Sequence, residues 1–314
     1  MVADHVAPGG PVAPGTGWPG DLATAATPVA GSAAEVRTLA AGSADLTELT
    51  ARQSVCRACP RLVSWREEVA ATRRKSFRDE RYWGRPIPGW GDPAASILIV
   101  GLAPAAHGGN RTGRIFTGDR SGDFLFAALY RCGLATLPTS TSAGDGQRLI
   151  GVRMAAAVGC APPENKPTPQ ERDECAPWLA AELRLMAPTL RVVVCLGGFA
   201  WQALWPVLAQ AGYPPPRPRP AFKHGAEATV RSGNTVLSGN TVRSGNTVRS
   251  GDEGRLLVLG CFHPSQQNTF TGRVTADMVD AVLSRARTYA AERSAAAEPN
   301  VPIATKSHIG RPIA

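Results

Sequence analysis

Four short apolar runs, separated by segments with helical spacing, constrain this fold more than any other feature of the sequence. They cover residues 97–100, 151–160, 191–197 and 256–260. Apolar runs of this length are typical of strands that are buried on both faces. Because strands that alternate with helices form parallel sheets covered on both sides, the chain is expected to be an α/β protein.

Helical spacing is found before, between and after these runs. It covers residues 46–59, 62–71, 121–133, 169–187, a segment after 197, and 274–291. Thr168 is the expected N-cap of the helix that starts at Pro169, because threonine caps well and proline suits the first helical position.

The two ends of the chain and one internal segment differ from this pattern. Residues 1–44 are rich in Ala, Gly, Pro, Ser and Thr, which predicts a disordered tail. The domain is expected over residues 45–292, followed by a flexible tail over 293–314. Copies of the hexapeptide Val-Arg-Ser-Gly-Asn-Thr predict a low-complexity insertion at about 226–253. A period of six can indicate a β-helix, but these copies have little apolar surface to stack, which favours a surface loop.

The charge of the chain suits a polyanionic partner. The net charge is +9, and residues 1–50 hold five acidic residues and one basic residue, so the remainder is strongly basic. Such a surface fits nucleic acid, although it also serves general solubility. The sequence has no apolar run near 18 residues and no signal-peptide pattern, so we expect a cytoplasmic protein with no membrane partner.

A second basic feature lies between residues 73 and 85, where arginines are interleaved with aromatic residues. This mixture fits a surface that follows a phosphate backbone. A solvated helix face joined to a packed aromatic loop explains it equally well.

A glycine-rich loop over residues 101–119 follows the first apolar run. Loops that leave the carboxyl ends of parallel strands are where open α/β sheets bind ligands. Six glycines between Gly101 and Gly122 allow backbone N–H groups to approach a bound group closely. His107, Phe116 and Asp119 add a polar edge, an aromatic face and a carboxylate. The loop is therefore the predicted active site.

Four of the seven cysteines have polar, proline-flanked surroundings that suggest a metal site. They form the pair Cys56-x2-Cys59 and the pair Cys160-x14-Cys175. Four thiolates hold either a tetrahedral zinc ion or a [4Fe–4S] cluster, and the spacing alone leaves both open. The other three, Cys132, Cys195 and Cys261, occupy apolar positions and are expected in the core.

The longest motifs resemble those of type B (family 5) uracil-DNA glycosylases. The loop from Gly101 to Arg114, with Phe116-Thr-Gly-Asp119, resembles their first motif, and the segment that starts at His263-Pro-Ser resembles their second. The four cysteines resemble the [4Fe–4S] ligands of families 4 and 5. The resemblance extends over residues 50 to 290.

This resemblance implies a three-layer α/β/α sandwich with a central four-stranded parallel sheet. It implies a base excision repair enzyme that flips uracil out of double-stranded DNA and hydrolyses the N-glycosidic bond. It also implies tolerance of hypoxanthine and ethenocytosine, and a structural [4Fe–4S] cluster. We expect a monomer that acts on double-stranded DNA containing damaged bases. The motifs contain no evident lysine nucleophile, so we expect a monofunctional enzyme that leaves an abasic site.

The expected site residues fall into four groups. Asp119 and His263 are the predicted catalytic residues, although Asp119 also suits an N-cap for the next helix. The predicted substrate-binding residues are Gly101, Leu102, Ala103, His107, Phe116 and Asn165. The predicted DNA-binding residues are Asn110, Arg111, Arg114, Ser265, Gln266, Asn268 and Arg273. The predicted cluster ligands are Cys56, Cys59, Cys160 and Cys175. A non-catalytic DNA-binding module and a zinc hydrolase are the competing interpretations.

Overall fold

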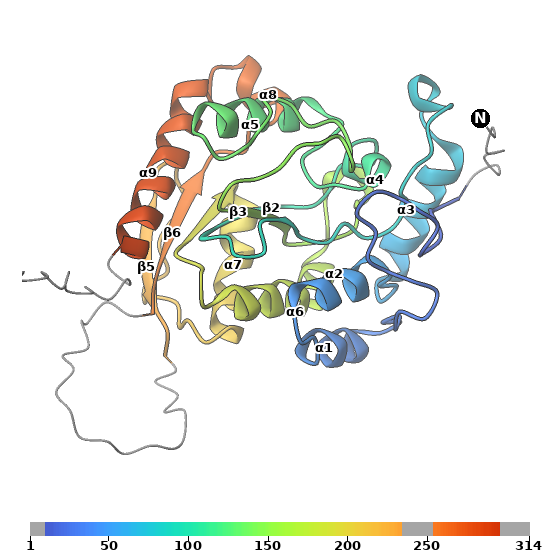
Figure 1. Cartoon of the computed structure of the whole chain (residues 1–314), viewed down its shortest axis with the longest axis horizontal. Coiled ribbons are helices and arrows are strands. Elements are labelled where there is room, and N and C mark those ends of the chain that lie inside the picture. The colour runs from blue at the N-terminus through green and yellow to red at the C-terminus, as the bar shows by residue number, and fades with distance from the viewer. Residues whose placement is uncertain (1–9, 234–253, 296–314) are drawn as a thin grey trace, which may run out of the picture.

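The computed structural model describes residues 10–233 and 254–295, which fold around one six-stranded sheet (Figure 1). The strands are β1 (Trp90–Gly91), β2 (Ile97–Gly101), β3 (Val152–Ala156), β4 (Val192–Leu196), β5 (Glu227–Arg231) and β6 (Arg255–Cys261). Their spatial order is β1-β3-β2-β4-β6-β5. The four central strands are parallel, which confirms the predicted parallel sheet. The antiparallel edge strands β1 and β5 were not predicted.

Helices cover both faces of the sheet and one of its ends. They are α1 (Ala33–Ala41), α2 (Leu46–Ser54), α3 (Pro60–Thr72), α4 (Gly109–Thr112), α5 (Arg120–Arg131), α6 (Pro169–Met186), α7 (Gly198–Gln210), α8 (Gln266–Phe270) and α9 (Ala276–Ala295). Two 3-10 turns, η1 (Lys75–Phe77) and η2 (Pro163–Asn165), complete the described elements. Within the described part of the chain, none of the helices is both long and apolar enough to cross a membrane.

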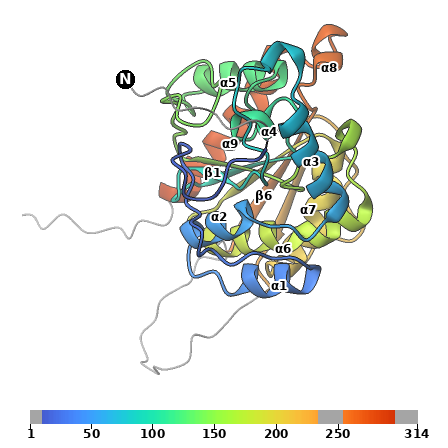
Figure 2. The same cartoon turned by 90° about the vertical axis from the view of Figure 1, so that its right-hand side faces the viewer.

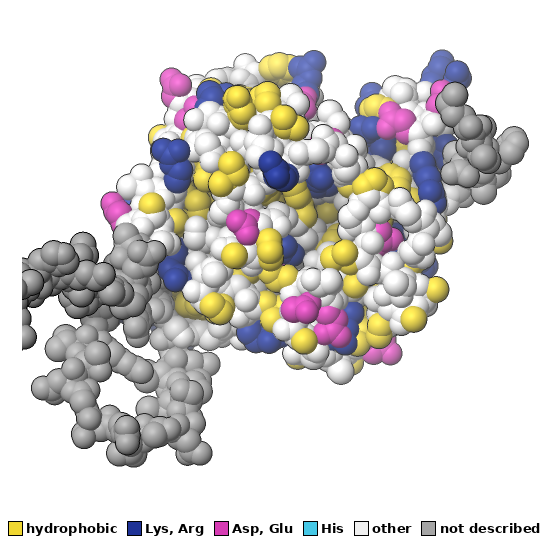
Figure 3. Space-filling view, in the orientation of Figure 1, with side chains coloured by type: hydrophobic (Ala, Val, Ile, Leu, Met, Phe, Trp, Pro, Cys, Tyr) yellow, Lys and Arg dark blue, Asp and Glu magenta, His cyan; other side chains and the backbone are white. Residues whose placement is uncertain are grey.

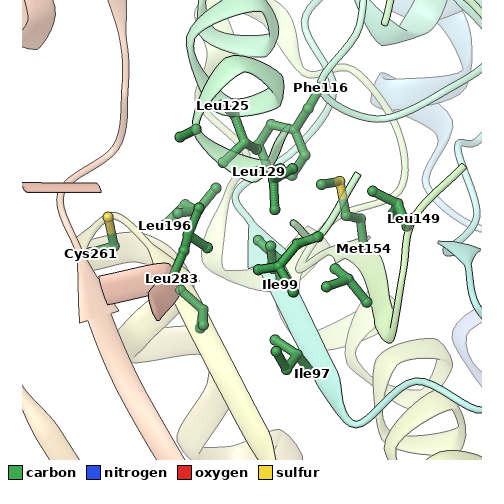
Figure 4. Packing of buried hydrophobic residues seen from close by; sticks show 14 of the residues in the cluster. Ile97, Ile99, Phe116, Leu125, Leu129, Leu149, Met154, Leu196, Cys261 and Leu283 are labelled. Carbon is green, nitrogen blue, oxygen red and sulfur yellow. The ribbon is translucent and has the colours of Figure 1, made fainter. Parts of the chain in front are cut away.

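Successive side chains along each strand point to opposite faces of the sheet and pack into two separate cores, as the pleat of a strand requires. On β2, Ile97 and Ile99 point to the face covered by α5 and α9, where Leu129 and Leu283 pack against them (Figure 4). Leu98 and Val100 of the same strand point to the opposite face, which α6 and α7 cover. Both faces of the parallel strands are therefore buried, and the three-layer prediction is confirmed.

The prediction of a disordered tail over residues 1–44 is wrong for residues 10–44. Val12, Ala30 and Val36 are buried, and the Val12 N–H donates to the Trp83 carbonyl oxygen at 2.9 Å. Ser32 caps α1, which packs against α6. The segment has too few apolar residues to fold alone, but its small side chains fill the surface that the domain offers. Residues 1–9 lie outside the described chain.

Three further boundaries differ from the sequence predictions. The predicted insertion begins inside β5, because residues 227–231 pair with β6 and bury Ala228 and Val230. Residues 234–253, which hold most of the repeat, are outside the described chain, as are residues 296–314. Helix α9 extends through 295, beyond the predicted start of the tail at 293. The helix predicted over 46–59 ends at Ser54, and Cys59 is extended as the residue before Pro60, which begins the next helix.

Candidate active site

The candidate active site lies where the parallel strands β2, β4 and β6 end. The glycine-rich loop follows β2, Gly197 follows β4, and His263 follows β6 by two residues. A methyl group added at Gly197 would lie 3.3 Å from the His263 Cβ, so these two connections are in close contact. The strand order therefore brings together the two motifs that are farthest apart in the sequence.

Phe116 closes the base of the loop against β2. Its φ of +59° is left-handed, and its ring lies so close to Gly101 that an added Cβ would be 2.5 Å from the ring Cζ. Glycine is therefore required at position 101. The ring packs towards Leu125 and Leu129 of α5, and Phe116 is only 7% exposed (Figure 4). The predicted stacking of a base on Phe116 is restricted to the small part of the ring that remains accessible.

The turn after β2 presents backbone N–H groups. The carbonyl oxygens of Gly101 and Leu102 accept bonds from Ala157 and Val158, which fixes the start of the loop. Among the described residues, the N–H groups of Ala103, Ala105, Ala106 and His107 have no hydrogen-bond acceptor. Unpaired N–H groups in such a loop are available to bind an anion or a carbonyl oxygen.

Asp119 is placed for both roles that the sequence left open, the N-cap of the next helix and a carboxylate in the site. Its Oδ1 accepts from the Gly122 N–H at 3.0 Å and caps α5. Its Oδ2 lies against the turn, because a methyl group at Gly108 would be 2.7 Å from it. Within the described chain this second oxygen accepts no hydrogen bond. The cap therefore orients the carboxylate and leaves one oxygen directed to the loop.

His263 is half-buried at the end of β6, and burial lowers the pKa of its imidazole, against a smaller opposing effect of the Asp119 charge. The neutral ring is therefore favoured at pH 7. Asp119 and His263 interact electrostatically, which places both predicted catalytic side chains in one site.

His224 is a site residue that sequence reasoning missed. Its Nδ1 accepts from the N–H of Phe262, the residue before His263, at 3.2 Å. Burial lowers the pKa of His224, and a hydrogen bond to the backbone of Met278 opposes this effect. The ring thus ties the end of β6 to α9. A single histidine in a proline-rich segment carried no signal of this contact.

His107 and Asn165 differ in how the structure places them. Nδ1 of His107 is hydrogen-bonded to the Tyr82 hydroxyl at 3.0 Å, and burial together with Arg74 and Arg111 lowers its pKa. His107 therefore lies in the glycine-rich loop, and Tyr82, from outside that loop, holds its ring in place. Asn165 is exposed in η2 with a φ of +58°, and its side chain forms no hydrogen bond within the described chain. Its predicted contact with a base stays a prediction.

Three predicted DNA contacts of the loop have partners within the protein. Asn110 is fully buried and donates to the Arg66 carbonyl oxygen, and its contact with DNA stays a prediction. Arg111 pairs with Glu80 and donates to two backbone carbonyl oxygens. Arg114 pairs with Asp145 at 2.6 Å and lies over the Trp90 ring. These two arginines hold neighbouring loops in place. Such bonds matter there because polar groups outside helices and strands need other hydrogen-bond partners.

The segment after His263 forms a short exposed helix. Ser265 caps α8, and the Asn268 side chain donates to the His263 carbonyl oxygen at 2.8 Å. Gln266 and Arg273 are exposed, with the Arg273 guanidinium 5.1 Å from the Phe262 ring centre. The four predicted DNA-binding residues of this segment therefore divide into two that shape it and two that are accessible.

The four predicted ligand cysteines line one cavity, together with Val36 of α1 and Trp178 of α6. Burial raises the pKa of the Cys56, Cys59 and Cys175 thiols. Arg66 donates to the Cys160 sulfur at 2.9 Å, and the Gly159 N–H donates to the Cys175 sulfur at 3.3 Å. Among the described residues, no group of three or more His, Cys, Asp or Glu could hold a metal ion. The three other cysteines are buried, as predicted.

Comparisons with known proteins agree with the resemblance of the motifs. The family model "Uracil DNA glycosylase superfamily" matches residues 88–287. A type-5 uracil-DNA glycosylase of Mycobacterium bovis is 52% identical over 280 residues, which cover 89% of this chain and 95% of that relative. A type-5 enzyme of Thermus thermophilus is 46% identical over 76% of this chain and 94% of its own. A type-4 uracil-DNA glycosylase of Archaeoglobus fulgidus is 33% identical over 38% of this chain and 52% of that relative.

The family-model match over residues 88–287 includes the sheet, the glycine-rich loop and the segment that contains His263. The matches agree with a fold in which the two motifs meet at one edge of a parallel sheet. The chain therefore belongs to the uracil-DNA glycosylase superfamily and, within it, to the type-5 uracil-DNA glycosylases.

Proposed function

We propose that this glycosylase takes a deaminated or modified base out of double-stranded DNA and hydrolyses its N-glycosidic bond at the loop formed by residues 101–119. Removal of uracil from DNA is the activity of its family. The single observation that carries the proposal is the juxtaposition of Asp119, His263 and a turn of unpaired backbone N–H groups.

The residues divide the work of bond cleavage between the base and the sugar. Flipping a nucleotide costs a few kcal/mol, and cleavage then builds negative charge on the base and positive charge on the sugar. The unpaired N–H groups of Ala103, Ala105, Ala106 and His107 hold a base carbonyl oxygen. Neutral His263 donates to the base as charge develops. The free oxygen of Asp119 orients the attacking water or stabilises the sugar cation.

We also propose that the pocket accepts hypoxanthine and ethenocytosine. The residues after Gly101 are Leu102, Ala103 and Pro104, which carry no side-chain hydrogen-bonding group. A pocket built to bond one base by polar side chains rejects an analogue that leaves those groups unpaired. This loop bonds the base through its backbone, so a larger base leaves fewer groups without partners.

A [4Fe–4S] cluster held by Cys56, Cys59, Cys160 and Cys175 is the proposed cofactor. The four thiols face one cavity, and Arg66 and the Gly159 N–H supply donors that favour thiolate sulfur. The cysteines come from three parts of the chain, so the cluster would hold these parts together as a structural group.

An excision assay with an absorption spectrum tests these proposals together. Purified protein in excess is incubated with duplexes that contain uracil, hypoxanthine or ethenocytosine, and with a matched undamaged duplex. We expect alkali-labile sites at the modified positions only, and intact strands without alkali. The protein solution should be brown, with absorption at about 400 nm. Binding without alkali-labile sites would favour a non-catalytic module, and strand breaks before alkali would contradict a monofunctional enzyme. A colourless active protein that contains zinc would contradict the cluster.

A further inference from the structure

A basic projection between α3 and the glycine-rich loop has cations that the pocket does not use. We call residues 73–81, which include η1, the tongue. The tongue has five arginine or lysine residues and two carboxylates, Asp79 and Glu80. Figure 3 shows Lys and Arg side chains gathered on the projecting upper right of the molecule, where Figure 1 places the segment after α3.

Three of these cations face solvent without strong partners. Arg74, Lys75 and Arg78 are exposed and line one open hollow. Within the described chain, Arg74 and Lys75 have no ion pair. Arg78 reaches only Asp79, at 3.5 Å, and both side chains are more than 70% exposed. An exposed pair of this kind contributes little, so all three cations are available to a polyanion.

The tongue is bound to the glycine-rich loop by side chains other than Arg74, Lys75 and Arg78. The Arg111 guanidinium lies 3.9 Å from the Phe77 ring centre and pairs with Glu80. Just past the tongue, the Tyr82 hydroxyl is bonded to His107 at 3.0 Å. These contacts therefore fix where the three cations lie relative to the glycine-rich loop.

The placement of the tongue suits a long, stiff polyanion. In both Figure 1 and Figure 2, the tongue and α8 project from the same upper side of the molecule. The glycine-rich loop contacts the tongue through Arg111, and His263 precedes α8 by three residues. A duplex with one nucleotide in the pocket extends past the loop and presents one phosphate charge per about 1.7 Å of its axis.

We infer that the tongue is a second DNA-binding element, which binds phosphates beside the flipped nucleotide through Arg74, Lys75 and Arg78. This inference rests on the proposed function, because that function sets where the duplex runs. Phosphate contacts of this kind fix the position of a protein on DNA and are independent of sequence. They replace the contacts predicted for Arg111 and Arg114, which the fold uses internally.

Removal of the three charges tests the inference. The variant R74A/K75A/R78A is compared with R37A/R148A/R231A, which removes three exposed arginines on other elements. Affinity for a short undamaged duplex is measured by anisotropy between 50 and 200 mM salt, a range in which about 0.9 of a unit in the log–log salt slope corresponds to one phosphate contact. We expect the tongue variant to bind more weakly, with a slope shallower by about 2 to 3. The other triple variant should keep a slope within about 1 of the wild type.

Two further arms make the outcome decisive. The variant R74K/K75R/R78K keeps the charges and should keep the wild-type slope, whereas a loss there would show a folding defect. Equal slopes in the tongue variant and the wild type would overturn the inference. In that case, release of uracil by the wild type would leave the proposed function intact. A tongue-dependent slope without any release of uracil would instead contradict the proposed function and leave the tongue as a DNA-binding element.

Discussion

At the scale of single residues, Asp119 combines a structural bond with a free oxygen. Oδ1 caps α5 through the Gly122 N–H, while Oδ2 faces the loop at Gly108. Asparagine and aspartate are almost equal as N-caps, but only aspartate carries charge. Asp119→Asn therefore separates the two roles, and Asp119→Ala removes both.

We expect Asp119→Asn to unfold like the wild type and to lose at least about a hundredfold in the single-turnover rate of uracil excision. Asp119→Ala should lose a similar amount of activity and also about 1 kcal/mol of unfolding free energy. Quench-flow assays under enzyme excess and thermal denaturation measure the two effects. An active Asp119→Asn enzyme would show that the carboxylate acts only as a cap.

The lowered pKa of His263 predicts the acid side of the pH profile. Burial keeps the imidazole neutral below its ordinary value of 6.5, despite the opposing charge of Asp119. Lowering the pH from 8 to 6.5 leaves the donor neutral, so the single-turnover rate of uracil excision should stay flat there and fall only at lower pH. His263→Asn should lose this acid limb. A wild-type rate already halved at pH 6.5 would contradict the assignment.

At the scale of elements, the segment before α1 is held to the domain by a buried ion pair. Arg85 and Asp21 are 2.5 Å apart, with side chains only 6% and 2% exposed. Burial lowers the pKa of Arg85, and the carboxylate of Asp21 opposes this effect. Loss of the carboxylate would leave the guanidinium buried without a partner, which is costly in a low-dielectric interior.

We expect Asp21→Ala to lower the unfolding free energy by about 3 kcal/mol and the melting temperature by about 6 to 12 °C. The double variant Asp21→Ala/Arg85→Met should recover much of the loss, because it removes the unpaired charge. Asp79→Ala, at a side chain that is 90% exposed, is the control and should change stability by less than about 0.5 kcal/mol. If the double variant lost as much unfolding free energy as Asp21→Ala, the loss would come from a packing defect and not from the unpaired charge.

At the scale of the whole molecule, the cysteine cavity connects parts of the chain that are far apart in sequence. Cys56 and Cys59 lie between α2 and α3, Cys160 follows β3, and Cys175 lies in α6. A group bound there in the native state stabilises all of these elements at once.

We expect Cys175→Ser to lose the brown colour and to melt at a lower temperature than the wild type. Cys132→Ser changes a buried thiol on α5's side of the sheet and should keep the colour. Iron content, absorption spectra and melting curves measure these effects. A Cys175→Ser protein that keeps both iron and the wild-type melting temperature would contradict the proposed cluster.

The sequence by itself determined the four parallel strands, the loop after β2 and the cysteine pairs. Each of these depends on local features: an apolar run marks a buried strand, glycines mark a close backbone approach, and the cysteine spacing predicts a set of ligands. The edge of the sheet where His263 meets the loop followed from the parallel order of the strands.

Only the tertiary structure decided which polar side chains face the ligand and which hold the fold. Asn110, Arg111 and Arg114 share the loop with Asp119, but buried or paired environments turn them inward. His224 reaches the site, and Asp21 pairs with the buried Arg85, from segments with no motif. Composition indicated a tail before residue 45, yet residues 10–44 fold because the domain buries their few apolar side chains. Such partners are set by contacts between distant residues, which no local pattern records.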